Sequence, residues 1–201
     1  WMKQDPFAGI KFKQPKTNPV FLTKEELDRI IDKDFKMERL ALVRDIFIFC
    51  AFTGLAFIDV RNLRQEHLLK DNEGQYWIRK PREKTDTMCN IPLLDIPLEI
   101  LQKYENHKTT IAKGVLLPVM CNQTMNSYLK EIADFCEIDK PISTHTARHS
   151  FSTSVALANG VSLSNLSKML GHTSTRMTEH YSKVLDQSVG ADMKMVQQRI
   201  G

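Results

Sequence analysis

Apolar positions recur at helical spacing over most of the chain. Thr23, followed by Glu26 three residues later, forms a capping box that predicts a helix running to about Ile31. Residues 37–52 carry their charges early and are apolar nearly all round at their centre, which indicates a buried helix that Gly54 ends. The same periodicity predicts further helices near 57–64, 97–106, 124–137, 145–159, 162–170, 174–182 and 186–199.

One part of the chain has a different pattern. Residues 76–78 and 88–91 are short runs rich in aromatic and aliphatic side chains, and the stretch between them, from Arg79 to Asp86, is polar and charged. This pattern predicts a β-hairpin or small sheet with a basic tip. The expected fold class is therefore mainly α with one small antiparallel β-sheet (α+β).

Composition narrows the class of protein. The chain has 201 residues, of which 42% are hydrophobic and 26% charged, as in an ordinary globular domain or a tight pair of domains. Collagen-like, fibrous and wholly disordered classes are excluded. The net charge of +4 permits a nucleic-acid partner without demonstrating one. The four cysteines lack CxxC spacing, which favours reduced thiols over a zinc ribbon, and the longest apolar run, 46–51, is too short for a membrane span of about 20 residues.

His145 and Arg148 are the first candidates for chemistry. Their spacing of three residues places both on one helix face, just after the N-cap candidates Ser143 and Thr144. An arginine fork matches a phosphate, and the first turn of a helix adds free backbone N–H groups. The alternative is a capped helix with a solvated arginine and a hydrogen-bonded histidine.

His172 and Tyr181 follow in the last third of the chain. His172 comes directly after the helix stop at Gly171, so it is either turned into a cleft or an ordinary polar neighbour of that stop. Tyr181 is either a packed aromatic residue or a nucleophile whose pKa, ordinarily about 10, must be lowered by nearby cations. His172 and His180 are a weak pair for a metal, because no partnered cysteine or carboxylate motif accompanies them.

The predicted hairpin carries Arg82 and Lys84. Residues two apart on a strand point to the same face, so we expect both side chains to reach one phosphate. The alternative is a solvated basic turn.

Taken together, these motifs resemble the tyrosine recombinase family, also called phage-type integrases, over about residues 20–190. The resemblance rests on the order of Thr53-Gly54-Leu55, Lys84, His145-x-x-Arg148, Leu170-Gly171-His172 and Tyr181. It implies the catalytic-domain fold of that family and a site-specific DNA recombinase or integrase of the mobile-element, conjugative-transposon type.

The resemblance also implies a role for each matching residue. Tyr181 would attack the scissile phosphate and form a 3′-phosphotyrosyl bond, and Lys84 would protonate the leaving 5′-oxygen. The bond energy is conserved in the covalent intermediate, so neither metal nor ATP nor any other cofactor is expected. His145 and Arg148 would bind the phosphate and aid proton transfer, His172 would donate to a non-bridging oxygen, and Asp59 would buttress the site.

One position departs from the family pattern. Ala56 stands where the family has its first phosphate-binding arginine, and a methyl group cannot bind phosphate. Arg82 is our candidate for a substitute, because strand alternation would put it beside Lys84. Arg61 lies about 140° further round a helix and faces elsewhere, while Arg44 remains possible.

The resemblance extends to organisation and partners. We expect residues 1–20 to be a basic linker from a missing N-terminal DNA-binding domain, 21–185 to be the catalytic domain, and 186–201 a C-terminal helix. The apolar stripe of that helix either packs on its own domain or docks on a neighbouring protomer (Val189, Met193, Val196 and Ile200). The expected partner is double-stranded DNA, bound by a homo-oligomer such as a tetramer, with accessory DNA-bending proteins, in the bacterial cytoplasm at the nucleoid and away from membranes.

Three other functions remain open. A type IB topoisomerase shares the chemistry but rejoins the same strand. A non-catalytic DNA-binding descendant of the family is favoured only by Ala56. A metal-dependent nuclease has no carboxylate cluster to recommend it.

Overall fold

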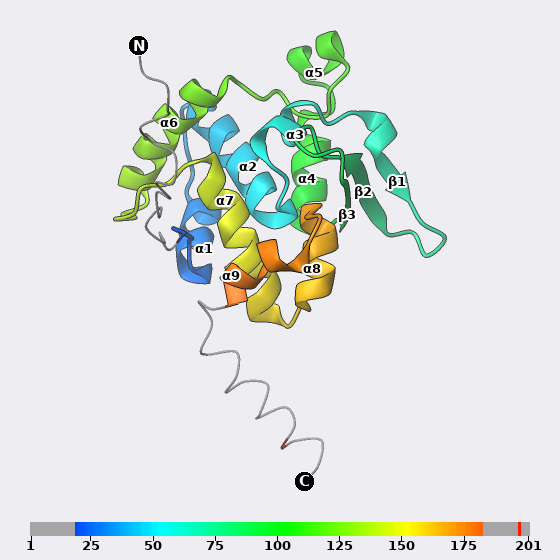
Figure 1. Ribbon diagram of the computed structural model, residues 1–201. Helices are drawn as coiled ribbons and strands as arrows, with labels where there is room; N and C mark the ends of the chain where they lie inside the picture. The colour runs from blue at the N-terminus through cyan, green and yellow to red at the C-terminus, as the bar shows by residue number, and fades with distance from the viewer. Residues whose placement is uncertain (1–18, 183–196, 198–201) are drawn as a thin grey trace, which may run out of the picture.

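A computed structural model describes residues 19–182 and Gln197. Its centre is helix α2 (Glu38–Thr53), which is buried along most of its length and contacts four other helices (Figure 1). These are α1 (Lys24–Asp32), α4 (Asp95–Tyr104), α6 (Asn122–Phe135) and α7 (Thr144–Ser150). The sequence of α2 is apolar all round the helix axis because neighbouring helices cover it on every side.

Shorter elements complete the helical part of the chain. Helix α3 (Phe57–Arg61), the 3₁₀ turn η1 (Gln65–His67) and α5 (Lys108–Lys113) lie near the sheet. The chain after α7 continues as the π-helical turn η2 (Phe151–Ala156) and the 3₁₀ turn η3 (Leu157–Asn159). The regular helix α8 (Leu163–Leu170), the 3₁₀ turn η4 (Thr175–Met177) and the last helical turn, α9 (Glu179–Ser182), follow.

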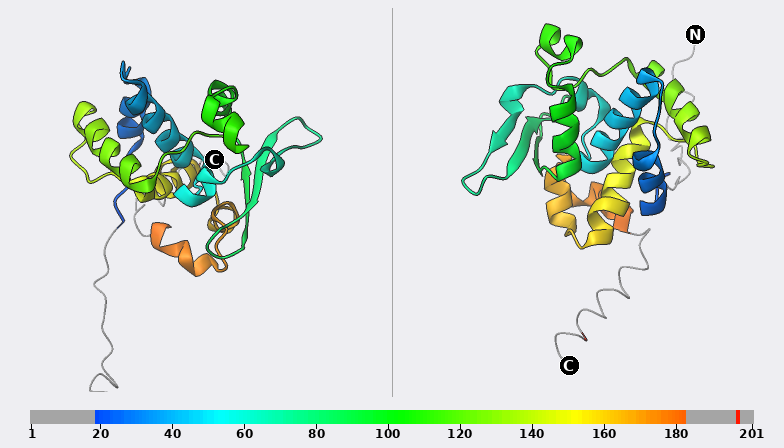
Figure 2. Two further views of the ribbon diagram at one scale, coloured as in Figure 1. Left: turned by 90° about the horizontal axis from the view of Figure 1, so that it is seen from above. Right: turned by 180° about the vertical axis from the view of Figure 1, so that it is seen from behind.

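The sheet has three antiparallel strands in the order β1 (Leu68–Lys70), β2 (Tyr76–Pro81) and β3 (Met88–Pro92). Ile78 pairs with Ile91 across the two inner strands, and both side chains are buried. Strand β3 packs against α8, while β1 forms the outer edge away from the helical body (Figure 2). The predicted mainly α fold with one small antiparallel sheet is confirmed.

The structure differs from the sequence-based expectation in the shorter elements, and one expected helix cannot be compared with it. Strand β1 and helix α5 were not predicted, because three and six residues are too few to establish a period. The single helix expected over 145–159 is divided into α7 and the turns η2 and η3. The helix expected over 186–199 falls outside the described residues, apart from Gln197.

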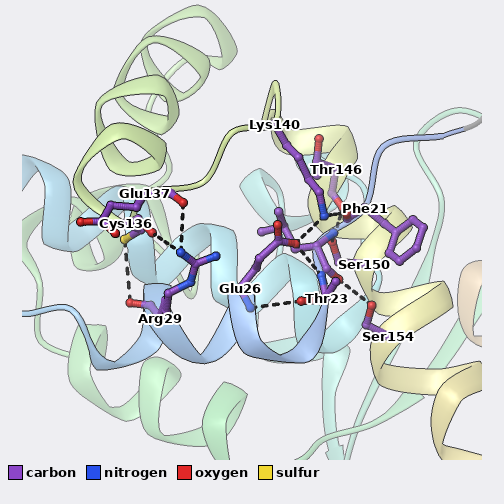
Figure 3. A network of polar contacts seen from close by, with 11 residues as sticks. Phe21, Thr23, Glu26, Arg29, Cys136, Glu137, Lys140, Thr146, Ser150 and Ser154 are labelled. Atoms are coloured by element: carbon purple, nitrogen blue, oxygen red, sulfur yellow. Dashed lines mark hydrogen bonds and ion pairs between the residues drawn. The ribbon is translucent and has the colours of Figure 1, made fainter.

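Helix α1 is tied to the chain around α7 by a network of polar contacts (Figure 3). The predicted capping box of Thr23 and Glu26 is present, and the Glu26 carboxylate also accepts a hydrogen bond from Lys140 at 2.6 Å. Nearby, the hydroxyl of Ser150 accepts the N–H of Leu22 at 2.8 Å. These contacts fix the first described segment against the helix that carries Arg148.

Within the described part of the chain, no helix is both long enough and apolar enough to cross a membrane.

Candidate active site

Arg148 is the most enclosed charge of the site. Its side chain projects from α7, the residue is only 8% exposed, and burial together with nearby Arg82 lowers its pKa. Nη1 donates to the carbonyl oxygen of Gly54 at 2.5 Å, and Nη2 donates to that of Leu170 at 2.7 Å. Both carbonyls belong to helix ends, because α2 ends at Gly54 and α8 ends at Gly171, each with a left-handed glycine. The guanidinium therefore sits between two helix C-termini.

His172 lies beside this guanidinium. Its Nε2 is 3.2 Å from Nη2 of Arg148, and its Nδ1 is 2.8 Å from the hydroxyl of Thr178. The left-handed conformation of Gly171 turns the chain so that His172 enters the site half-buried. Of the two alternatives for this histidine, its half-buried position beside Arg148 favours the one in which it faces the candidate site.

Tyr181 closes the site from α9. The residue is 4% exposed and packs against Phe151, Leu166 and Leu170. Burial raises the pKa of Tyr181. The positive charges of Arg148 and Arg82 and the nearby Ser152 side chain oppose that rise. Thus two guanidinium groups lie close enough to the phenol to favour its charged form.

Arg82 reaches the same place from the hairpin. Its Nη1 donates to the carbonyl oxygen of Gly171 at 3.4 Å, and its buried Nε has no hydrogen-bond partner among the described residues. Its aliphatic carbons pack on Gly171 so closely that a Cβ there would lie 2.8 Å from Cδ. The structure therefore brings Arg82 together with Arg148, His172 and Tyr181.

Arg82 does not lie on a strand, so the predicted strand alternation of Arg82 and Lys84 is wrong. Strand β2 ends at Pro81, and residues 82–87 form a turn in which the N–H of Asp86 donates to the carbonyl of Arg82 at 2.9 Å. Strand alternation does not apply within such a turn. Arg82 points inward and is half-buried, whereas Lys84 is exposed at the tip.

Asp59 holds this turn in place. It is 1% exposed, and its Oδ1 accepts the backbone N–H of Glu83 at 2.9 Å. The carboxylate of Glu83 in turn receives Nζ of the buried Lys80 at 2.8 Å. Lys80 and Glu83 were not predicted, because nothing in their spacing separates them from an ordinary charged hairpin. Asp59 thus lies beneath the segment between Arg82 and Lys84.

His145 lies one helical turn before Arg148 in α7. It is exposed in the first turn of α7, where Ser143 is the N-cap and forms a capping box with Thr146. A side chain from α6 adds to this arrangement, since Oδ1 of Asn126 accepts the N–H of Thr144 at 3.0 Å. Two helices therefore define the position of His145.

Arg44 and Arg61, the other arginines considered as substitutes for the missing one, do not reach the site. Ala56 is the N-cap of α3 and has no polar side-chain atom to offer. Arg44 is engaged elsewhere, donating to Asp45 at 2.6 Å and to the carbonyl of Lys33 at 2.8 Å. Arg61 is exposed at the end of α3.

One residue of the site was missed entirely. Nδ1 of His149 lies 3.0 Å from the hydroxyl oxygen of Tyr181. Its position four residues after His145 places both histidines on the same side of α7, and this spacing could have identified it. No group of three or more histidine, cysteine or acidic side chains suited to a metal occurs in the described chain.

Comparison with known proteins shows the family of the chain. The family model described as Phage integrase family matches residues 20–188. A tyrosine recombinase of Pseudothermotoga lettingae is 28% identical over 193 residues, covering 92% of this chain and 63% of that protein, so the chain spans less than two thirds of this relative.

Solved structures show the same fold. The XerH site-specific recombinase in a post-cleavage complex with a palindromic difH substrate is 20% identical, has a TM-score of 0.70, and matches 90% of this chain and 54% of its own. The Tn1549 transposon integrase bound to circular intermediate DNA is 19% identical, with a TM-score of 0.62 and coverage of 92% and 68%. The fold is that of a tyrosine recombinase catalytic domain, and the chain belongs to the phage integrase family.

Proposed function

We propose that this chain is the catalytic domain of a site-specific DNA recombinase that cleaves and rejoins strands through Tyr181. The observation that carries the proposal is the placement of the Tyr181 hydroxyl near two guanidinium groups, those of Arg148 and Arg82. Such a pair can hold a phosphodiester and stabilise the charge that builds up on it during displacement.

In the proposed reaction each of these groups has one role. The oxygen of Tyr181 attacks phosphorus, the bond from phosphorus to O5′ breaks, and a proton from Nζ of Lys84 goes to the leaving oxygen. His145 and His172 donate to the non-bridging oxygens. The exposed positions of Lys84 and His145 suit groups that meet DNA from outside. A 5′-hydroxyl then reverses the step, so no ATP is consumed.

Arg82 takes the place of the family's first phosphate-binding arginine, which is replaced by Ala56 in this chain. Its support is the contact with Gly171 and its electrostatic effect on both Arg148 and Tyr181. The main competing function, DNA binding without cleavage, is favoured by Ala56 alone.

Tyr181→Phe tests the nucleophile. The protein is incubated in EDTA with a nicked duplex carrying the end of its own genetic element, and covalent protein–DNA bands are counted on a denaturing gel. We expect a band with the parent protein and none with the variant, because only the phenolic oxygen can form the phosphotyrosyl bond. Retained DNA binding with no band from the parent chain, either alone or in its full-length protein, would instead establish the non-catalytic function.

Arg82→Ala tests the substitute arginine. Loss of one preorganised charge donor typically lowers the rate of the chemical step by about 10²–10³-fold, and we expect a decrease of that size in covalent complex formation. Arg79→Ala is the matched control, since Arg79 is an exposed arginine of the same hairpin, near Trp77. Equal cleavage by Arg82→Ala and the parent protein would refute the assignment.

The wider setting is also a proposal. We infer an enzyme of the conjugative-transposon type, acting on double-stranded DNA in the bacterial cytoplasm as a tetramer with accessory DNA-bending proteins. Residues 1–20 would link residues 21–185 to an N-terminal DNA-binding domain. The XerH complex with its difH substrate supports DNA as the partner.

Segment 186–201 is proposed to dock on a neighbouring protomer. A mainly apolar cavity of about 580 Å³ is available for its apolar stripe, between α1, β3, η2 and α8; Leu27, Phe52, Ile91, Val155 and Met169 are among its lining residues. A chain truncated after Ser182 should bind DNA without assembling into higher complexes on a native gel. Unchanged assembly would contradict the docking.

A further inference from the structure

The hydroxyl of the proposed nucleophile is in direct contact with a histidine that has no role in the scheme above. Nδ1 of His149 and the oxygen of Tyr181 are 3.0 Å apart, and the two ring centroids are 5.6 Å apart with the planes tilted by 49°. A separation of 3.0 Å lies within the range for a hydrogen bond along which a proton can be transferred.

Two elements fix this contact. His149 directly follows Arg148 in α7, so the helix that places the guanidinium also places the imidazole. Tyr181 is held by its apolar neighbours in α8 and η2, while the Ser152 hydroxyl of η2 donates to the carbonyl oxygen of Arg148 at 2.9 Å. The contact is therefore built from the same rigid parts as the phosphate site.

The chemistry requires a proton acceptor at this point. A neutral phenol is a weak nucleophile, and burial makes Tyr181 hold its proton more firmly. The guanidinium groups of Arg148 and Arg82 cannot accept a proton, because arginine remains charged in proteins. Lys84 is exposed and serves the leaving oxygen. His145 is exposed in the first turn of α7, and the ring nitrogens of His172 contact Arg148 and Thr178. An imidazole, whose ordinary pKa is about 6.5, is mostly neutral at pH 7 and can accept one.

We propose that His149 is the general base that removes the proton from Tyr181 during strand cleavage. This inference rests on the proposed function. As the bond from the Tyr181 oxygen to phosphorus forms, its proton passes to Nδ1 of His149, which carries its own hydrogen on Nε2. The bond from phosphorus to O5′ breaks, and O5′ takes a proton from Lys84. Imidazolium and neutral amine result, and rejoining returns both protons.

His149→Gln is the first test, because glutamine can accept the hydrogen bond but not the proton. We expect covalent complex formation to slow by about 10²–10⁴-fold, the usual range for a general base. His107→Gln, in an exposed histidine at the start of α5, is the matched control and should cleave like the parent protein.

Two chemical substitutions separate a base from a structural role. A substrate with sulfur in place of the bridging 5′-oxygen has a leaving group that needs no proton, so it should restore cleavage by Lys84→Ala but not by His149→Gln. Fluorotyrosine at position 181 ionises more easily, and it should restore much of the rate lost in His149→Gln.

The outcomes are distinct. Cleavage by His149→Gln at the parent rate, or rescue of this variant by the sulfur substrate alone, would overturn the role of His149 while leaving Tyr181 as nucleophile. Failure of fluorotyrosine to raise its rate would also contradict deprotonation by His149. Absence of covalent complex with the parent protein would refute the proposed function itself.

Discussion

The site requires a residue without a Cβ at Gly171. Its φ of +59° is in the left-handed region, and a Cβ there would lie 2.7 Å from Sγ of Cys89 and 2.8 Å from Cδ of Arg82. The glycine thus ends α8, turns His172 inward and leaves room for Arg82, which we propose as the substitute for the arginine absent at position 56.

Gly171→Ala should therefore impair cleavage more than its effect on folding explains. Gly160→Ala is the control, since Gly160 also has a positive φ, +82°, but nothing lies within 4 Å of an added Cβ. Each change should lower the free energy of unfolding by about 1–2 kcal/mol through backbone strain. Only Gly171→Ala should also displace Arg82 and reduce covalent complex formation. Urea unfolding measures the stability of both variants. Equal cleavage by the two would show that Gly171 does not determine the position of Arg82.

Sequence alone named most of the residues that form the candidate site but not how they are arranged. Spacing after a glycine stop was enough to place His172, and helical periodicity paired His145 with Arg148. Arg82 was reached from an assumed strand that proves to be a turn. The spacing of His149 after His145 could have identified it, but its contact with Tyr181 of α9, more than thirty residues later in the chain, is encoded by no local pattern.

Helices with clear caps were predictable and the shortest elements were not. Thr23 and Ser143 both cap as expected, and glycines end α2 and α8. The π-helical turn η2 was not foreseen, because side-chain periodicity cannot separate it from a regular helix over six residues. The conformation of the hairpin turn could not be predicted either, because it depends on a hydrogen bond to Asp59 of α3.

Asp59→Ala should loosen that hairpin turn. The N–H of Glu83 would lose its buried acceptor, which costs about 1–3 kcal/mol of unfolding free energy, and cleavage should fall because Arg82 and Lys84 flank Glu83. Asp59→Asn keeps an acceptor oxygen and should have a smaller effect on both measurements.

Asp71→Ala is the matched control for the hairpin. Oδ1 of Asp71 also accepts backbone N–H groups in a turn, those of Glu73 and Gln75, but at the β1–β2 end of the sheet. It should lower stability, measured by urea unfolding, without a specific loss of cleavage. If Asp71→Ala and Asp59→Ala reduced cleavage equally, the special role of the turn beside Arg82 would be disproved.

The packing of the whole chain can be checked through its four cysteines. Cys50, Cys89 and Cys136 are buried, and burial raises the pKa of Cys50 to about 12 and that of Cys89 to about 11. Cys121 is exposed at the N-cap of α6, where hydrogen bonds from the Thr124 hydroxyl and backbone lower its pKa. As pH rises, Cys121 therefore becomes the reactive thiolate first.

Brief alkylation at pH 8 should modify one site in the folded protein and four in denaturant. Mass spectrometry of the digested protein identifies the site, and Cys121→Ser should remove the native-state label. Rapid labelling of Cys89 in the native protein would contradict the packing of β3 against Gly171 and Arg82.

The position of Arg148 between two carbonyl oxygens has a consequence for how the site would bind the phosphate of the proposed DNA substrate. The guanidinium is held by the carbonyl oxygens of Gly54 and Leu170, which are neutral acceptors at helix ends. A carboxylate in their place would have formed an ion pair that an incoming phosphate must first break. With neutral acceptors, a phosphate adds its negative charge to a cation that is already oriented, so the attraction between them is not diminished by an exchange of partners.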